Sequence, residues 1–160
     1  MPSVGAAQAA TATPRIRRVQ NQKRIAPGPT MTPAARLPAH KHDLAAVEAL
    51  ARLPASAWIA HAPQLLEWLR DGNWPVARPV ARLLASTGAA TMPALARVFD
   101  GDDAIWKCGC IESLLAALPP ADWESLRPRL QRLADAPDPA ELAEGAAEAA
   151  QTLLRRRDRA

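Results

Sequence analysis

One segment of this sequence recurs with the same pattern of apolar and turn residues. LLEWLRDG at residues 65–72 matches ALARVFDG at residues 94–101, at an offset of 29 residues. Each copy is followed by a tryptophan, Trp74 or Trp106, and a weaker third copy begins with LQRLAD at residues 130–135. Because a pair of helices that recurs every roughly 30 to 40 residues is typical of an α-solenoid, the repeat predicts stacked helix pairs.

The composition also favours helices over strands. Apolar residues make up 49% of the 160 residues, mostly Ala and Leu, with one Phe and no Tyr. Strands, in contrast, are enriched in β-branched and aromatic residues. We therefore predict an all-α fold, a HEAT-like, right-handed α–α superhelix of about seven helices.

Capping residues and prolines predict where these helices begin and end. Asp43 is expected to cap a first helix that ends before Pro54, and Pro63 is expected to break a helix over residues 57–70. Asp138-Pro139-Ala140-Glu141 is a strong start signal for the last helix, which is expected to run to the arginines at 155–159. The other helices are expected over residues 75–86, from Thr91 to Asp100, from Asp102 or Asp103 to Leu118, and over residues 122–134.

The segment DGNWPVARPVARLL at residues 71–84 predicts a joint between two helices rather than a ligand site. Asp-Gly ends one helix, Asn73 is available as a cap, and Pro75 suits a first helical turn. Pro79 removes a backbone donor and is expected to bend the start of the next helix.

Charge divides the chain into two parts. The net charge is +4, yet the segment before Asp43 contains seven Lys and Arg residues and no acidic residue, so the remainder carries −3. We predict a disordered basic N-terminal extension over residues 1–36 and a HEAT-like helical domain over residues 37–157. If Met31 is the true start, residues 1–30 are an extension of little consequence; an organellar transit peptide has a similar composition. Nucleic acid is expected to contact only this basic arm.

The sequence gives no sign of a membrane segment or of a disulfide framework. It has no apolar run of about 18 residues and no continuous apolar core of the signal-peptide kind. The two cysteines, Cys108 and Cys110, are spaced so that an intact helix separates their directions. We therefore expect a cytoplasmic protein with one buried and one partly exposed thiol.

Three stretches together resemble a known family. LPAHKHDLAAVEALARL, LLEWLRDGNWPVARPVARLL and DDAIWK, in this order and spacing, resemble the bacterial family called domain of unknown function 5071, over about residues 37–154. The resemblance implies a HEAT-like superhelix and no particular activity. After IWK the chain departs from the family pattern, because Cys108-Gly109-Cys110 stands in place of larger apolar or aromatic residues.

His40, His42 and Asp43 are residues of the kinds that bind zinc. A zinc site usually needs a fixed geometry and a fourth ligand, and no such ligand is near in sequence. We therefore favour exposed histidines beside a helix cap and expect no metal.

Trp74 and Trp106 occupy matching positions in successive repeats. They would either wedge between helices or anchor a partner, since Trp is frequent at interface hot spots, and burial is the favoured interpretation. The polar residues near them are also candidates for partner binding, namely Asn73, Arg78, Asp103 and Lys107. The candidates for partner binding further include His40, His42 and Asp43.

The sequence contains no motif for a catalytic triad, a phosphate-binding loop or an HExxH zinc site, and we expect no cofactor. Stacked helix pairs offer an extended rigid surface. The expected function is therefore that of a non-enzymatic protein–protein interaction module, whose partner is another protein. Two alternatives remain: an immunity or antitoxin-like protein that binds a toxin, and a metal-binding enzyme that uses His40, His42 and Asp43.

Overall fold

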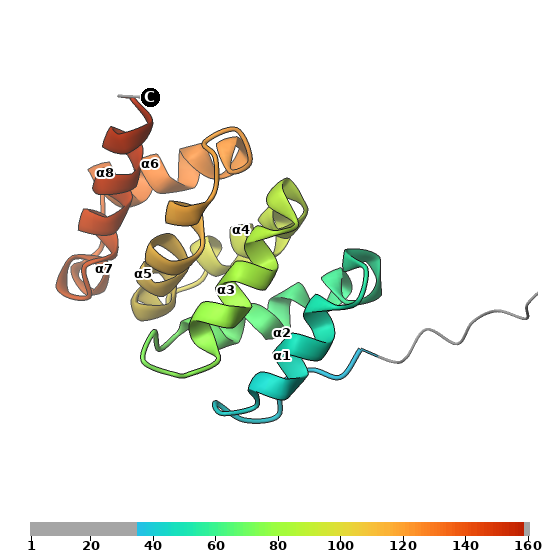
Figure 1. Ribbon diagram of the computed structural model, residues 1–160. Helices are drawn as coiled ribbons and strands as arrows, with labels where there is room; N and C mark the ends of the chain where they lie inside the picture. Colours follow the sequence, from blue (N-terminus) through green and yellow to red (C-terminus); the bar gives the residue numbers. More distant parts are fainter. Residues whose placement is uncertain (1–34, 159–160) are drawn as a thin grey trace, which may run out of the picture. The chain divides into compact units, whose positions relative to one another are not determined.

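The computed structural model describes residues 35–158, and all regular structure in this part of the chain is helical (Figure 1). The expected all-α fold is confirmed. The α-helices are α1 Leu44–Ala51, α2 Ala62–Leu66, α3 Ala77–Ala85, α4 Met92–Asp100, α5 Ala104–Ser113, α6 Arg127–Asp135, α7 Pro139–Ala143 and α8 Ala146–Arg157. Short 3-10 helices cover Ala55–Ala57, Ile59–His61, Glu67–Leu69, Gly88–Thr91, Leu115–Ala117 and Glu124–Leu126.

The helices of residues 35–158 form two layers. In the first layer α1 packs on α3, α3 on α5, and α5 on α8; in the second layer α2 packs on α4, and α4 on α6 (Figure 1). Contacts between α2 and α3, α4 and α5, and α6 and α8 join the two layers. Successive helix pairs thus lie side by side, while the HEAT-like classification and the handedness stay predictions.

All three helices of the second layer begin in the same way. A 3-10 turn leads into each helix, and the second residue of the helix is a proline, at Pro63, Pro93 and Pro128. A proline in the first turn costs little, because the N–H that it lacks would have no acceptor in the helix. The segment over residues 57–70 is divided next to Pro63, as predicted, since the 3-10 helix Ile59–His61 ends there and α2 begins at Ala62.

Residues 71–84 form a joint between two helices, but not in the way that the sequence predicted. Since α3 begins at Ala77, Pro79 lies in its first turn, where the N–H that it lacks would have no acceptor within the helix. Asn73 does not cap α3; its N–H instead donates to Oδ1 of Asp71 at 2.9 Å. The backbone N–H of Val76 donates to the carbonyl of Lys41 at 3.2 Å, which ties the joint to the loop before α1.

Two further helix boundaries differ in part from expectation. Thr91 is the N-cap residue of α4, as predicted, but its side chain makes no capping hydrogen bond; its buried hydroxyl is 2.7 Å from Oγ1 of Thr87 and donates to the carbonyl of Leu84 at 3.4 Å. Near the C-terminus, the capping box of Asp138 and Glu141 is present as predicted, but the helix that it starts is only α7. Gly145 then adopts a left-handed conformation with φ of 77°, so a new helix, α8, follows. This break gives eight α-helices within residues 35–158, where about seven were expected.

The core runs continuously between the two layers and consists mainly of leucines. Two tryptophans, Trp58 and Trp123, are almost completely buried in it. None of the helices within residues 35–158 has the length and apolar character needed to cross a membrane. Of the N-terminal extension predicted over residues 1–36, residues 1–34 lie outside the described part of the chain.

Candidate functional site

The loop that contains His40 and His42 leads into α1. Both histidines are exposed, and His40 Nδ1 accepts the backbone N–H of His42 at 3.3 Å. Asp43 is buried and caps α1 by accepting the N–H of Ala46, as the sequence predicted. Across the described residues, no group of three or more His, Cys, Asp or Glu side chains is placed to hold a metal ion.

Both oxygens of the Asp43 carboxylate are already engaged. Oδ1 accepts from Ala46, while Oδ2 accepts the N–H of Ala39 at 3.1 Å and the guanidinium of Arg36 at 3.0 Å. The hydrogen bond from Ala39 is the main cause that lowers the pKa of Asp43 below its ordinary value, with smaller contributions from Ala46 and Arg36. These contacts fix the carboxylate as a structural cap.

Trp74 and Trp106 are both partly buried against the core and pack at joints between helices. Trp106 donates its indole N–H to the carbonyl of Leu66 at 2.7 Å, and the guanidinium of Arg70 lies 4.3 Å from its ring centroid, a cation–π contact. Trp74 packs against Trp68 in an edge-to-face arrangement with ring centroids 5.6 Å apart. The contacts of both tryptophans are therefore with neighbouring parts of the fold, as expected of side chains that wedge between helices.

The polar neighbours of the tryptophans do not form a common surface. Asp103 caps α5 by accepting the N–H of Trp106 at 2.9 Å and pairs with Arg70 at 3.5 Å. Lys107 is only 2% exposed, so it is not available to a partner. Asn73 and Arg78 are exposed and face the same hollow of the first layer.

Lys107 belongs to a buried ion cluster that the sequence did not reveal. Its Nζ lies 2.6 Å from Oε1 of Glu141, a completely buried carboxylate, and Arg132 binds both oxygens of the same carboxylate at 2.5 and 2.6 Å. The backbone N–H of Asp138 also donates to Glu141 at 2.9 Å. Hydrogen bonding to Arg132, and then to Lys107 and Asp138, lowers the pKa of Glu141 to about 2 despite its burial. The cluster ties α5, α6 and α7 together.

A series of connected hollows runs along the first layer. One hollow lies between α1 and α3, a second between α3 and α5, and a third between α5 and α8, while a fourth adjoins the loop at Asp71 and Gly72. Glu112 lines three of the four hollows, and Arg82 lines two. We call this surface of α1, α3, α5 and α8 the grooved face.

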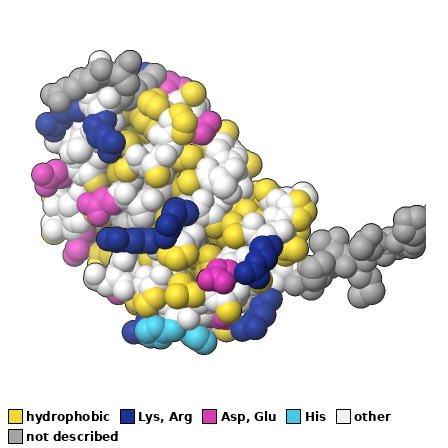
Figure 2. All heavy atoms as spheres, in the orientation of Figure 1, with side chains coloured by type: hydrophobic (Ala, Val, Ile, Leu, Met, Phe, Trp, Pro, Cys, Tyr) yellow, Lys and Arg dark blue, Asp and Glu magenta, His cyan; other side chains and the backbone are white. Residues whose placement is uncertain are grey.

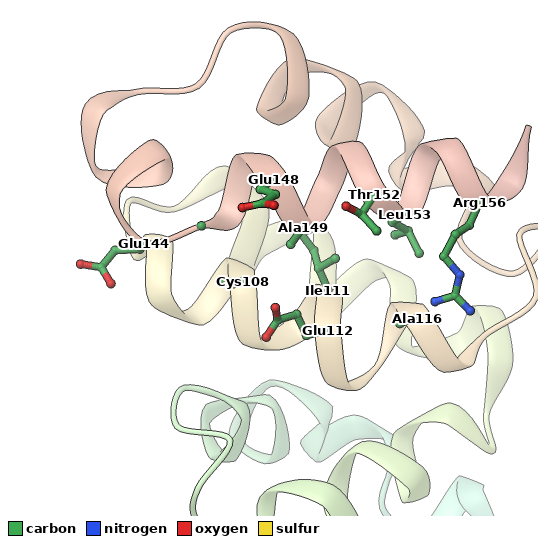
Figure 3. A pocket seen from close by; sticks show the side chains of 11 residues that line it. Cys108, Ile111, Glu112, Ala116, Glu144, Glu148, Ala149, Thr152, Leu153 and Arg156 are labelled. Atoms are coloured by element: carbon green, nitrogen blue, oxygen red, sulfur yellow. The ribbon is translucent and has the colours of Figure 1, made fainter.

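The hollow between α5 and α8 is a groove of about 610 Å³ (Figure 3). Apolar side chains form part of its lining: Ile111, Ala116, Ala149 and Leu153. Glu144 and Glu148 lie near the start of α8, Glu112 approaches from α5, and Arg156 lies at the opposite end. The groove is therefore both apolar and acidic.

The charges of the grooved face are mixed. Figure 2 shows acidic side chains around α7 and basic side chains both over α3 and toward the C-terminal end of α8. Burial raises the pKa of the Cys108 thiol at the edge of the groove, and the negative charges of Glu112 and Glu144 raise it further. The local potential is thus negative, and Cys108 is not activated as a nucleophile.

The two cysteines lie as the sequence predicted, with Cys110 buried and Cys108 partly exposed. Burial raises the pKa of Cys110 far above its ordinary value, so this thiol stays protonated. Neither thiol has the low pKa that nucleophilic chemistry requires. The grooved face, in contrast, was missed, because Glu112, Glu144 and Glu148 resemble ordinary surface charges of helices in the sequence.

Comparison with known proteins supports a single assignment. No curated protein matches the chain. The family model described as "Domain of unknown function (DUF5071)" matches residues 36–154, which confirms the resemblance inferred from the HKHD, NWPVA and IWK stretches. Because this match covers most of the chain, the protein belongs to the family of the domain of unknown function 5071.

Proposed function

We propose that this protein is a non-enzymatic interaction module that binds another protein through the grooved face. The observation that carries the proposal is the series of connected hollows along α1, α3, α5 and α8. Interfaces combine an apolar centre with a polar rim, and the grooved face has both. An open surface of this kind suits a polypeptide better than a small substrate, which enzymes usually enclose.

Unpaired charges on this face add support. Within residues 35–158, no ion pair involves Arg78 or Arg82 on α3, or Glu112 on α5. These exposed side chains can pair with a partner without breaking an ion pair within the protein, and they would steer its approach. Inhibition of a toxin is one form that this function could take, and the identity of the partner decides it.

Site-specific photo-crosslinking in the native cell tests the proposal. A photoreactive amino acid is placed on the grooved face at Arg82 or Thr152, and in matched controls at Arg97 or Gln131, which are exposed on the second layer. A discrete crosslinked protein that forms from the first pair of positions and not from the second supports the proposal. Equal crosslinking from both layers, or none from the grooved face, contradicts it.

A further inference from the structure

The glutamates of the α5–α8 groove lack cationic partners in the described part of the chain. Glu112, Glu144 and Glu148 are all exposed, and none of them forms an ion pair there. Other acidic residues of the fold do have partners, as Asp100 has in Arg129 at 2.7 Å. Three carboxylates around one groove repel each other, and bound cations would relieve this repulsion.

The floor between these glutamates is apolar. Ile111 of α5 and Leu153 of α8 are buried where the two helices meet, with only 2% and 6% of their surface exposed, so the partly exposed Ala116 and Ala149 present most of the apolar surface of the floor. Next to it, an adjoining hollow shares Cys108, Glu112 and Glu144 with the groove and includes Ile105, which is 53% exposed. Acidic groups thus border an apolar strip that continues from one hollow into the next.

We propose that the groove between α5 and α8 binds an amphipathic segment of another protein, whose Lys or Arg side chains pair with Glu112, Glu144 and Glu148. Apolar side chains of the segment lie along Ala116 and Ala149, the partly exposed apolar residues of the groove, as an amphipathic helix lies in a groove. Charge complementarity selects a basic segment over an acidic one. This inference rests on the proposed function and names the chemistry of the partner.

Arg156 sets the direction of the bound segment. It lies at the end of the groove opposite Glu144 and Glu148 (Figure 3), so a cation there would be repelled. The basic part of the segment therefore lies at the glutamate end, and a neutral or acidic part lies near Arg156.

A direct binding measurement with the full-length protein tests this inference. The probe is a short fluorescent peptide built of Leu-Arg-Lys-Ala repeats, and its binding is followed by fluorescence anisotropy at low and high salt. We expect the triple variant Glu112→Gln, Glu144→Gln, Glu148→Gln to bind at least about tenfold more weakly, with a smaller salt dependence. The matched control is Glu67→Gln with Asp102→Asn, two exposed acidic residues that line none of the four hollows, and it is expected to bind nearly as well as the parent. Retained helical circular dichroism shows that each variant is folded.

Three results would overturn the inference. The first is a parent protein that does not bind the basic peptide at low salt. The second is a triple variant that binds as tightly as the parent. The third is equal binding of a peptide in which serine replaces leucine, because the apolar floor would then be irrelevant. If crosslinking still finds a partner on the grooved face, the proposed function stands and only this inference fails.

Discussion

Gly109 of α5 lies directly against the carbonyl oxygen of Leu69, so that a β-carbon at this position would lie far inside van der Waals contact with the backbone. The contact joins the Glu67–Leu69 helix to α5, two elements far apart in the sequence. Glycine lowers helix propensity, but at this position it allows α5 to approach a neighbouring backbone.

Gly109→Ala is therefore expected to destabilise the protein by roughly 2 to 3 kcal/mol, because a backbone carbonyl cannot move aside as a flexible side chain can. Gly72→Ala is the matched control, since nothing lies within 4 Å of the added carbon and its backbone is not left-handed. We expect that change to stay within about 0.5 kcal/mol. Urea denaturation of both variants checks the prediction, and equal stabilities would refute the close approach.

In the buried ion cluster, replacing Glu141 is expected to destabilise the protein more than replacing Lys107. Glu141→Leu leaves Lys107 buried without a counter-ion and is expected to cost about 3 to 5 kcal/mol. Lys107→Met removes the buried cation and leaves Glu141 paired with Arg132, so its cost is expected to be clearly smaller. Chemical denaturation measures both free energies of unfolding. A larger loss for Lys107→Met than for Glu141→Leu would contradict this view of the cluster.

The same cluster is expected to make the stability of the protein depend on pH. The pKa of Glu141 is lowered from 4.5 to about 2 in the folded protein, so the ionised carboxylate favours folding. This stabilisation is fully present above pH 4.5 and is lost as the pH falls toward 2. Thermal unfolding of the parent and of Glu141→Gln is compared across this window. We expect the stability difference between them to shrink as the pH falls, and a constant difference would argue against the lowered pKa.

Trp106 and Trp74 are expected to respond differently to replacement by phenylalanine. Trp106→Phe removes the indole N–H that donates to the carbonyl of Leu66 and should cost about 1 kcal/mol beyond the loss of ring area. Trp74→Phe keeps an aromatic ring against Trp68 and serves as the matched control. Thermal denaturation followed by circular dichroism compares the two. If the Trp74 variant is the less stable one, the hydrogen bond of Trp106 is not what holds this joint.

Gly145→Ala tests the break between α7 and α8. With φ of 77°, the added β-carbon meets no neighbour within 4 Å, so only backbone strain opposes it. We expect a loss of about 1 to 2 kcal/mol, and a smaller loss for Gly145→Asn, because Asn tolerates the left-handed region better. Equal losses for Ala and Asn in a denaturation series would point to another cause.

Local signals in the sequence predicted local structure well. The side chains of Asp43, Asp103 and Asp138 each accept a hydrogen bond from the backbone N–H three residues ahead. Such a cap involves only four consecutive residues, so the local sequence is enough to predict it. The all-α fold followed in the same way from composition and helical spacing. The start of α3 was placed two residues early, because Pro75 and Pro79 both satisfy the rules for a first turn.

Contacts between distant residues could not be predicted from these signals. Lys107 and Glu141 are 34 residues apart, and nothing near Lys107 in the sequence indicates that its ammonium group is buried. The same holds for Gly109 against Leu69, and for the groove, whose walls come from α5 and α8. Such contacts depend on how the helices pack, and the sequence pattern of a single helix does not contain that information.

The prolines at the start of α2, α4 and α6 also act before the protein has folded. Proline disfavours helical backbone in the residue that precedes it and cannot continue a helix that comes from the N-terminal side. In the unfolded chain, each of Pro63, Pro93 and Pro128 therefore prevents neighbouring apolar stretches from merging into one long helix of the wrong register. Nascent helices would then form as separate units of suitable length, and pairing between the two layers would start from segments whose boundaries are already set.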